Sequence, residues 1–384
     1  MNGRRLRLLM IPSGIIGALV WGCAAGADAP PSEPRASEEH DASESPAIAV
    51  DASDARSEGD GSCSDDGWCL VEPPWNGDLT LVSLWGSSKN DVWAVGSRGA
   101  IFHWDGSAWQ RSDTGVDRVI RRVWGSGPGD VWAFSTLDEV LHCSGWVDGQ
   151  ASWSPVRFAM REDSLLLFAD QLTTPVVSVW GAGANDIYIG TLQIPGGSSV
   201  WHMNGLNDGK TNWQPILEYK DFHGPVFGTS ATDVWAAGLN GKVASSQGYK
   251  DGIIDWTLLD SGTRANLRGL WGSAHDDVWV VGDVGTIRHF TYDDDGVLRW
   301  LPSESNVTRS LTAVWGSRPD DVWAVGEGRT VLHGDGEHWT PSTLPAGISA
   351  ETRLFDVWGT SPDDVWIVGD NVILERRGPS EVPQ

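Results

Sequence analysis

The sequence predicts an all-β fold, a seven-bladed β-propeller of four-stranded blades, and three observations support this prediction. An aromatic residue followed by Gly recurs seven times in 384 residues, always with an Asp six positions after the aromatic. The copies lie 39 to 56 residues apart, a spacing typical of propeller blades. Each copy contains four short strands with Gly and Asp turns, a unit too small to bury its own faces. The seven pairs are Trp85 with Asp91, Trp124 with Asp130, Trp180 with Asp186, Phe227 with Asp233, Trp271 with Asp277, Trp315 with Asp321 and Trp358 with Asp364.

The first 22 residues have the pattern of a signal peptide. Three Arg residues precede an apolar stretch over residues 8–21, which is shorter than the roughly 20 residues that a membrane-spanning helix needs. The segment Val20-Trp21-Gly22-Cys23 resembles a bacterial lipobox, which implies cleavage before Cys23 and a diacylglycerol anchor on that residue. We therefore expect a lipoprotein signal peptide over 1–22, with an ordinary secretory signal as the alternative.

Residues 23–62 are expected to form a disordered acidic tether. From residue 24 to residue 62 there are ten acidic and two basic side chains, and Ala, Ser and Pro supply most of the rest. Such a segment repels itself and lacks the apolar side chains needed for a core.

The propeller is expected to occupy residues 63–378, with a short tail at 379–384. After the second strand of the first copy come an alternating strand at residues 100–104, an Asp-Gly turn and a strand headed by Trp109. Only six such Trp-headed fourth strands follow the seven copies, but Trp68-Cys69-Leu70-Val71 has the same character. The N-terminal strand is therefore expected to complete the last blade and close the ring.

Most of the 24 Trp residues are expected to pack blade against blade, because 19 of them fall on three repeated positions. The seven repeated Asp residues begin the second strands, where a carboxylate accepts bonds from a turn, so we assign them a structural role. Histidines on separate blades cannot converge on one metal ion, and they are assigned a structural role as well. These are His103, His142, His202, His289 and His333.

The repeats Trp85-Gly86-Ser87 with Asp91–Gly96, and their copies, resemble those of a family of uncharacterised myxobacterial-type envelope lipoproteins. The lead-in Cys63–Cys69 resembles the start of those proteins. This resemblance implies a propeller in the cell envelope and no particular activity. The Asp-Gly hairpins, such as the one at 293–296, are similar to Asp-box turns of sialidase-type propellers, a likeness that concerns the fold alone.

Composition and motifs argue against several functions. A net charge of −25 disfavours binding to nucleic acid phosphates. No nucleophile elbow, phosphate loop or zinc spacing is found, and a sialidase-like hydrolase would need a Tyr–Glu pair with convergent Arg residues. The Asp-rich turn at 293–296 lacks the downstream Glu of a calcium loop. We expect no catalytic residues, no metal and no cofactor.

Three cysteines of the propeller region have expected states. Cys63 and Cys69 are close in an exported chain and bracket the closing strand, so a disulfide is expected. Cys143 occupies the position of Trp104 and Phe290 in its own blade, which predicts a buried free thiol.

A candidate binding face follows from two insertions. The connection from Trp153 to Trp180 and the second-to-third-strand connection of the next blade are both longer than their counterparts, and both belong to one face of the disc. Their apolar content exceeds that of a solvated loop, so they are expected to form either a binding surface or a plug over the channel. The candidate residues are Phe158, Met160, Leu166, Leu167, Phe168, Leu172, Leu192 and Ile194.

These observations predict a non-catalytic, membrane-tethered interaction module. It would bind a protein or polysaccharide of a bacterial cell envelope, as a monomer, with the outer membrane favoured as its location. A glycan-processing hydrolase and a periplasmic assembly or scaffolding factor are the alternatives on the same fold.

Overall fold

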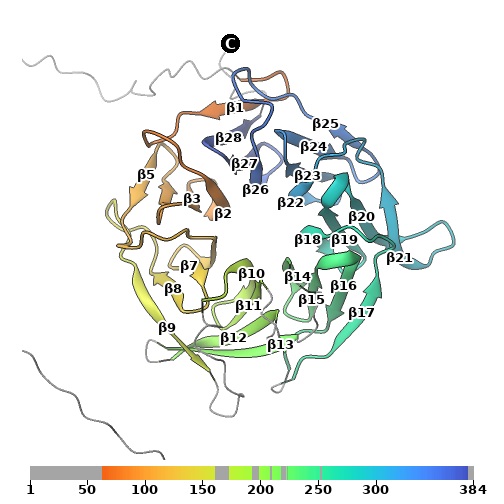
Figure 1. Ribbon diagram of the computed structural model, residues 1–384, viewed down its shortest axis with the longest axis horizontal. Helices are drawn as coiled ribbons and strands as arrows, with labels where there is room; N and C mark the ends of the chain where they lie inside the picture. Colours follow the sequence, from red (N-terminus) through yellow and green to blue (C-terminus); the bar gives the residue numbers. More distant parts are fainter. Residues whose placement is uncertain are drawn as a thin grey trace, which may run out of the picture. The chain divides into compact units, whose positions relative to one another are not determined.

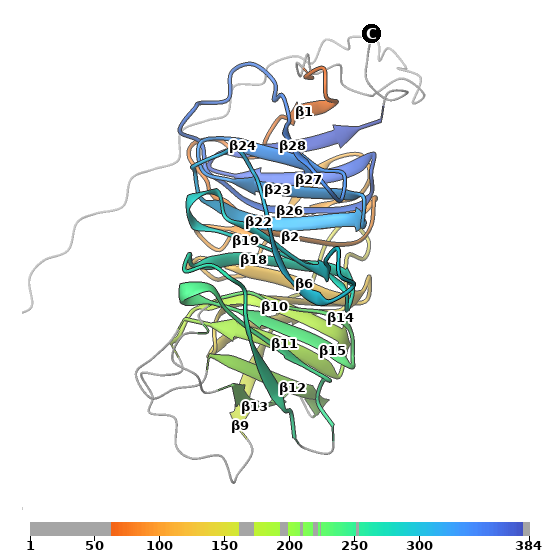
Figure 2. The same cartoon turned by 90° about the vertical axis from the view of Figure 1, so that its right-hand side faces the viewer.

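The computed structural model describes residues 63–160, 173–192, 199–207, 210–217, 222, 224–250 and 253–378, and these residues form a seven-bladed propeller. Figure 1 shows the blades arranged around one axis, and Figure 2 shows the ring from its side. In blade 1 an antiparallel meander runs from the axis to the rim. Its strands are β2 (Leu81–Ser88), β3 (Asp91–Gly96), β4 (Ile101–Trp104) and β5 (Trp109–Ser112).

The other blades repeat this order. Blade 2 consists of β6 (Arg122–Gly127), β7 (Asp130–Thr136), β8 (Glu139–Cys143) and β9 (Ser154–Met160). Blade 3 consists of β10 (Val176–Gly183), β11 (Asp186–Thr191), β12 (Val200–Asn207) and β13 (Lys210–Leu217). Blade 4 consists of β14 (Val226–Ser230), β15 (Asp233–Ala237), β16 (Lys242–Ser246) and β17 (Trp256–Asp260). Blade 5 consists of β18 (Leu267–Ala274), β19 (Asp277–Gly282), β20 (Ile287–Tyr292) and β21 (Leu298–Ser303). Blade 6 consists of β22 (Leu311–Arg318), β23 (Asp321–Gly326), β24 (Thr330–Gly334) and β25 (Trp339–Pro341). Blade 7 consists of β26 (Leu354–Ser361), β27 (Asp364–Gly369), β28 (Val372–Arg377) and β1 (Trp68–Val71).

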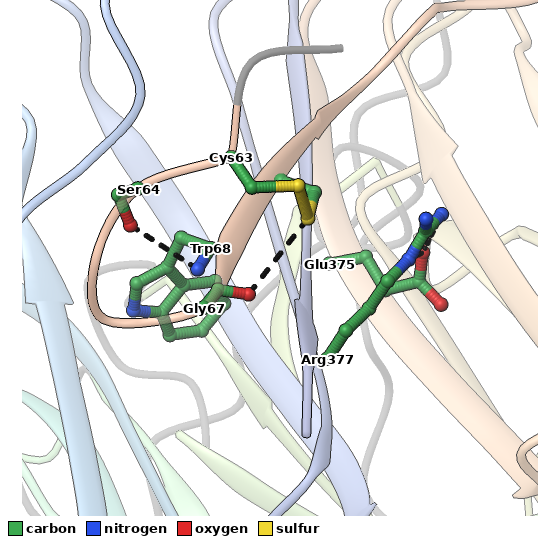
Figure 3. The surroundings of a disulfide bond; sticks show 7 residues. Cys63, Ser64, Gly67, Trp68, Glu375 and Arg377 are labelled. Carbon is green, nitrogen blue, oxygen red and sulfur yellow. Dashed lines mark hydrogen bonds and ion pairs between the residues drawn. A yellow bond between two sulfur atoms is a disulfide. The ribbon is translucent and has the colours of Figure 1, made fainter. Parts of the chain in front are cut away.

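The N-terminal strand closes the ring, as the sequence predicts. β1 pairs antiparallel with β28, with Trp68 opposite Arg376, and forms the outer strand of blade 7. The innermost strand of each blade contacts the innermost strand of the next, and β26 contacts β2, so the circle is complete. The Cys63–Cys69 disulfide lies at the start of β1, and the Trp68 backbone N–H donates to Ser64 Oγ beside it (Figure 3).

The Trp residues of the first and fourth strands pack between neighbouring blades. The Trp of each innermost strand lies over the Gly of the next blade, and a Cβ atom added to Gly125 would stand 2.5 Å from the ring of Trp85. The Trp-Gly pair is thus one interblade contact, in which Gly admits the ring. The fourth-strand Trp packs edge-on against the second-strand Trp of the preceding blade, with 5.2 Å between the ring centroids of Trp68 and Trp323. The same arrangement joins Trp109 to Trp366, Trp153 to Trp93, Trp300 to Trp235 and Trp339 to Trp279.

Blades 2 and 3 depart from the regular pattern. Their outer strands β9 and β13 pair in parallel, from Arg157 opposite Lys210 to Met160 opposite Trp213, and this joins the two blades into one eight-stranded sheet. Phe158 and Met160 were expected in the connection after the fourth strand, and this was wrong, because both belong to β9. The fourth strand continues because β13 supplies its outer edge with hydrogen-bond partners.

Candidate functional site

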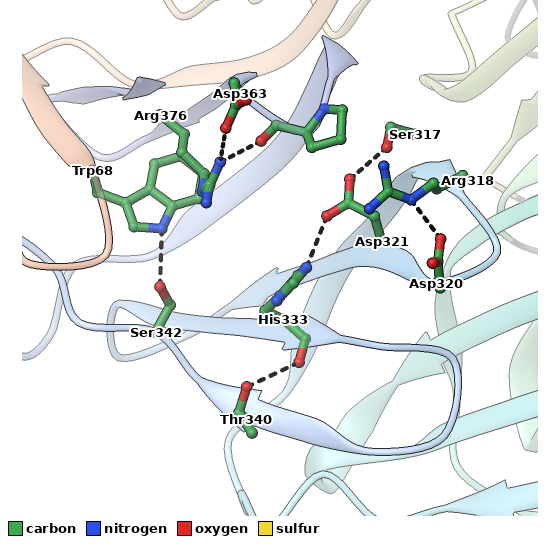
Figure 4. A network of polar contacts seen from close by, with 11 residues as sticks. Trp68, Ser317, Arg318, Asp320, Asp321, His333, Thr340, Ser342, Asp363 and Arg376 are labelled. Carbon is green, nitrogen blue, oxygen red and sulfur yellow. Dashed lines mark hydrogen bonds and ion pairs between the residues drawn. The ribbon is translucent and has the colours of Figure 1, made fainter. Parts of the chain in front are cut away.

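The repeated Asp residues bind the strands of each blade to one another. Asp321, at the start of β23, accepts a hydrogen bond from Ser317 Oγ at 2.5 Å, and its other oxygen lies 2.8 Å from His333 Nε2 on β24 (Figure 4). In blade 2 the indole of Trp132 also donates to Asp130, at 3.0 Å. Three strands therefore meet at one carboxylate, which is a structural role.

An Asp–His pair of this kind is present in five blades. Burial acts to raise the pKa of Asp91, but the hydrogen bonds from His103 and Ser87 outweigh it and hold that pKa below its ordinary value. The same balance lowers the pKa of Asp130, Asp277 and Asp321. The pairs are His103 with Asp91, His142 with Asp130, His202 with Asp186, His289 with Asp277 and His333 with Asp321, at 2.6 to 2.8 Å.

Blades 4 and 7 lack the strand histidine and differ from each other. In blade 4, Ser245 lies opposite Trp235, and Asp233 is paired instead with His275 of blade 5, whose Nδ1 lies 2.7 Å away. In blade 7, Glu375 lies opposite Trp366 and is held by Arg377 at 2.6 Å.

The predicted binding residues fall partly within the described chain. Leu192 follows β11, and 44% of its surface is exposed. Phe158 and Met160 lie in β9 at the rim of blade 2. Leu166, Leu167, Phe168, Leu172 and Ile194, together with Cys23, lie outside the described residues.

The opposite face exposes apolar side chains that sequence reasoning missed. The hairpins between third and fourth strands of blades 2, 4 and 5 carry Val147, Ile253, Tyr292 and Val297, each between 48% and 63% exposed. Within the Asp-rich hairpin, Asp293 accepts the backbone N–H groups of Asp295 and Val297. No group of three or more metal-ligating side chains is found among the described residues.

The innermost strands have an unpaired edge toward the axis, and side chains of neighbouring blades satisfy part of it. The residue two positions before each first-strand aromatic does this where it carries an acceptor. Ser83 Oγ accepts the Val123 N–H, and Ser178 Oγ accepts the Val226 N–H at 2.8 Å. We call these seven positions the axial tier. They are Ser83, Arg122, Ser178, Pro225, Gly269, Ala313 and Asp356.

Two members of the axial tier are charged, and they flank blade 1 from both sides. Asp356 of β26 accepts the Leu84 N–H at 2.9 Å, whereas Arg122 of β6 donates through Nη1 to Val82 O at 3.3 Å. Both residues are half-buried. Burial lowers the pKa of the Arg122 guanidinium, opposed by the charge of Asp356. Burial also raises the pKa of Asp356, opposed by Arg122.

Comparisons with known proteins bear on the fold. No protein-family model and no curated protein sequence matches the chain. The structure is similar to YCF48 bound to D1 peptide, with a TM-score of 0.61 and 16% identity over 83% of this chain and 99% of that one. It is also similar to YCF48 from Cyanidioschyzon merolae, with a TM-score of 0.61 and 17% identity over 82% of this chain and 100% of that one. A third similar structure is the WD40 propeller domain of Doa1, with a TM-score of 0.57 and 12% identity over 83% of this chain and 100% of that one. At these identities the similarity concerns the fold.

Proposed function

We propose that this chain is a non-catalytic interaction module, tethered to a membrane of a bacterial cell envelope, that binds a protein or polysaccharide there. The observation that carries the proposal is the closed ring, a fold shared with a propeller whose structure holds a peptide. The Asp–His pairs support it, because these titratable groups are engaged in bonds between strands. Exposed apolar side chains such as Leu192 supply contact area.

Two measurements on the purified full chain distinguish binding from catalysis: affinity for a partner and turnover of glycosides. A glycan array, together with cross-linking in envelope extracts, first identifies the partner, and the affinity of the purified chain for it is then measured. Leu192→Ser should weaken binding up to tenfold, about 1.4 kcal/mol, and Ile253→Ser on the opposite face is the matched control. If Ile253→Ser has the larger effect, the partner lies on the opposite face. Turnover of any glycoside in a panel would overturn a role in binding alone.

The tether is tested by its anchor. No helix among the described residues is long and apolar enough to cross a membrane. The proposed attachment is a lipid on Cys23, and Ala24 after it is not the Asp that retains some lipoproteins at the inner membrane, so we favour the outer membrane. Cys23→Ser should move the protein to the soluble fraction. A parent chain that is already soluble and has no lipid mass contradicts this.

A further inference from the structure

One member of the axial tier, Arg122, is positively charged. Five of its seven members are Ser, Pro, Gly or Ala, so the inner strands pack around the axis without a charged side chain at this level. Arg122 departs from that pattern and adds its charge next to that of Arg121. A cation in a half-buried place gains from a counter-charge, because protein surrounds it on more sides than water does.

The bonds of Arg122 leave one edge of its guanidinium open. Nη1 donates to the Arg121 carbonyl at 2.7 Å and to Val82 O at 3.3 Å. Among the described residues, no acceptor forms a hydrogen bond with Nε or Nη2, and no carboxylate oxygen lies within 4.0 Å of the guanidinium nitrogens. The unpartnered buried nitrogens of the described chain include Arg288 Nε and Arg376 Nε but none of Arg122, so solvent reaches its open edge.

The neighbouring acid is already engaged. Asp356 accepts the backbone N–H groups of Leu84 and Val357, at 2.9 and 3.0 Å, and a hydrogen bond from Ser83. It therefore offsets the charge of Arg122 at a distance without occupying its donors. With Arg121 included, the three side chains leave one net positive charge at this part of the axis.

We propose that Arg122 is the centre of an oxyanion-binding site on the propeller axis, in which its Nε and Nη2 hold a carboxylate or phosphate group through two parallel hydrogen bonds. The open Nε–Nη2 edge is the fork of the guanidinium that matches two oxygens of such a group. Blades 4 to 6, with Pro225, Gly269 and Ala313 in the axial tier, bring no acid to this level. The occupant is either a small free oxyanion or the terminal carboxylate of a bound peptide.

The test measures the binding of inorganic phosphate to the full chain from the broadening of the phosphate ³¹P NMR line. We expect the parent protein to broaden this line, and we expect Arg122→Met to bind phosphate at least tenfold more weakly. The matched control is Arg268→Met, because Arg268 lies on the inner strand of blade 5 but is already paired with Asp283. Absence of binding by the parent, or equal binding by the parent and Arg122→Met, overturns the proposal, as does equal loss in the control.

Two further arms address folding and the source of the anion. Arg122→Lys keeps the charge and a donor for Val82 O but lacks the fork, so it should melt like the parent and bind phosphate at least fivefold more weakly. Parent-like affinity in this variant overturns the two-bond geometry.

A short peptide, tested as the free acid and as the C-terminal amide, distinguishes the two sources of the anion. Preference for the acid indicates a peptide terminus, and phosphate binding without peptide binding indicates a free anion. Because the probes are defined, this test is independent of the envelope partner.

Discussion

The closing strand gives a direct test of how the ring is held. Trp68 is fully buried, and its indole donates to Ser342 Oγ at 3.0 Å (Figure 4). A Trp side chain of ~200 Å² at ~25 cal/mol per Å² is worth at most ~5 kcal/mol, and the hydrogen bond adds ~1 kcal/mol. Core substitutions of Trp by Ala cost ~3–5 kcal/mol, so we expect Trp68→Ala to cost ~4 kcal/mol.

That loss converts into a melting temperature. At ~2.1 cal/mol/K of unfolding entropy per residue, a propeller of roughly 300 residues has ~0.63 kcal/mol/K, and Trp68→Ala should lower the midpoint by about 6 °C. Calorimetry of the parent and the variant measures this. Trp339→Ala, at the corresponding position of blade 6, should cost a similar amount, whereas Trp75→Ala, half-buried and bonded to Asn371, should cost less than half. A Trp68→Ala midpoint no lower than that of Trp75→Ala would refute the reasoning.

Three further results are expected. The pKa of Asp321 lies below 3.8 in the folded protein, so its bonds stabilise the fold above about pH 3.8 and are lost as the pH falls below that value. Melting curves recorded from pH 6 to pH 2.5 should show this loss, and Asp321→Asn should make it smaller. Replacing Cys63 and Cys69 by Ser should cost ~2.4 kcal/mol from loop entropy and lower the calorimetric midpoint by about 4 °C, and an unchanged midpoint would contradict this. Burial raises the pKa of the Cys143 thiol to about 11, so a thiol reagent should label it in urea and leave it unlabelled in the native protein at pH 7.5.

The architecture could be predicted because the same pattern of strands and turns occurs seven times in the sequence. The count of fourth strands identified β1 as the closing strand, and the spacing of the Trp residues identified interblade packing. The parallel pairing of β9 with β13 could not be predicted in this way, because it joins two outer strands that the repeat treats as independent edges. Whether an outer strand continues past its blade depends on a tertiary partner, and periodicity contains no information about that partner.

The polar contacts were predictable to a lesser degree. In four blades His follows the repeated Asp by 12 positions, as in Asp91 and His103, so the pairing was present in the sequence as a constant offset. Recognising it required the register of β3 against β4, which places the two residues on one side of the sheet. The partner of Asp233 in blade 4 could not be predicted from this offset. That partner, His275, comes from the next blade and bonds through Nδ1, whereas the other pairs use Nε2.

The exceptions to the repeat are of two kinds. In blade 4 the missing histidine is replaced from a neighbouring blade, so Asp233 keeps a histidine partner, whereas in blade 7 Asp364 is bonded by Thr360 and Trp366. At the axial tier the exception is an addition, because Arg122 and Asp356 put charges where five blades have none. Asp356 is explained by the two N–H groups that it accepts, whereas Arg122 has an unused fork. A half-buried charge costs part of its hydration, and the anion binding that we propose for Arg122 would offset this cost.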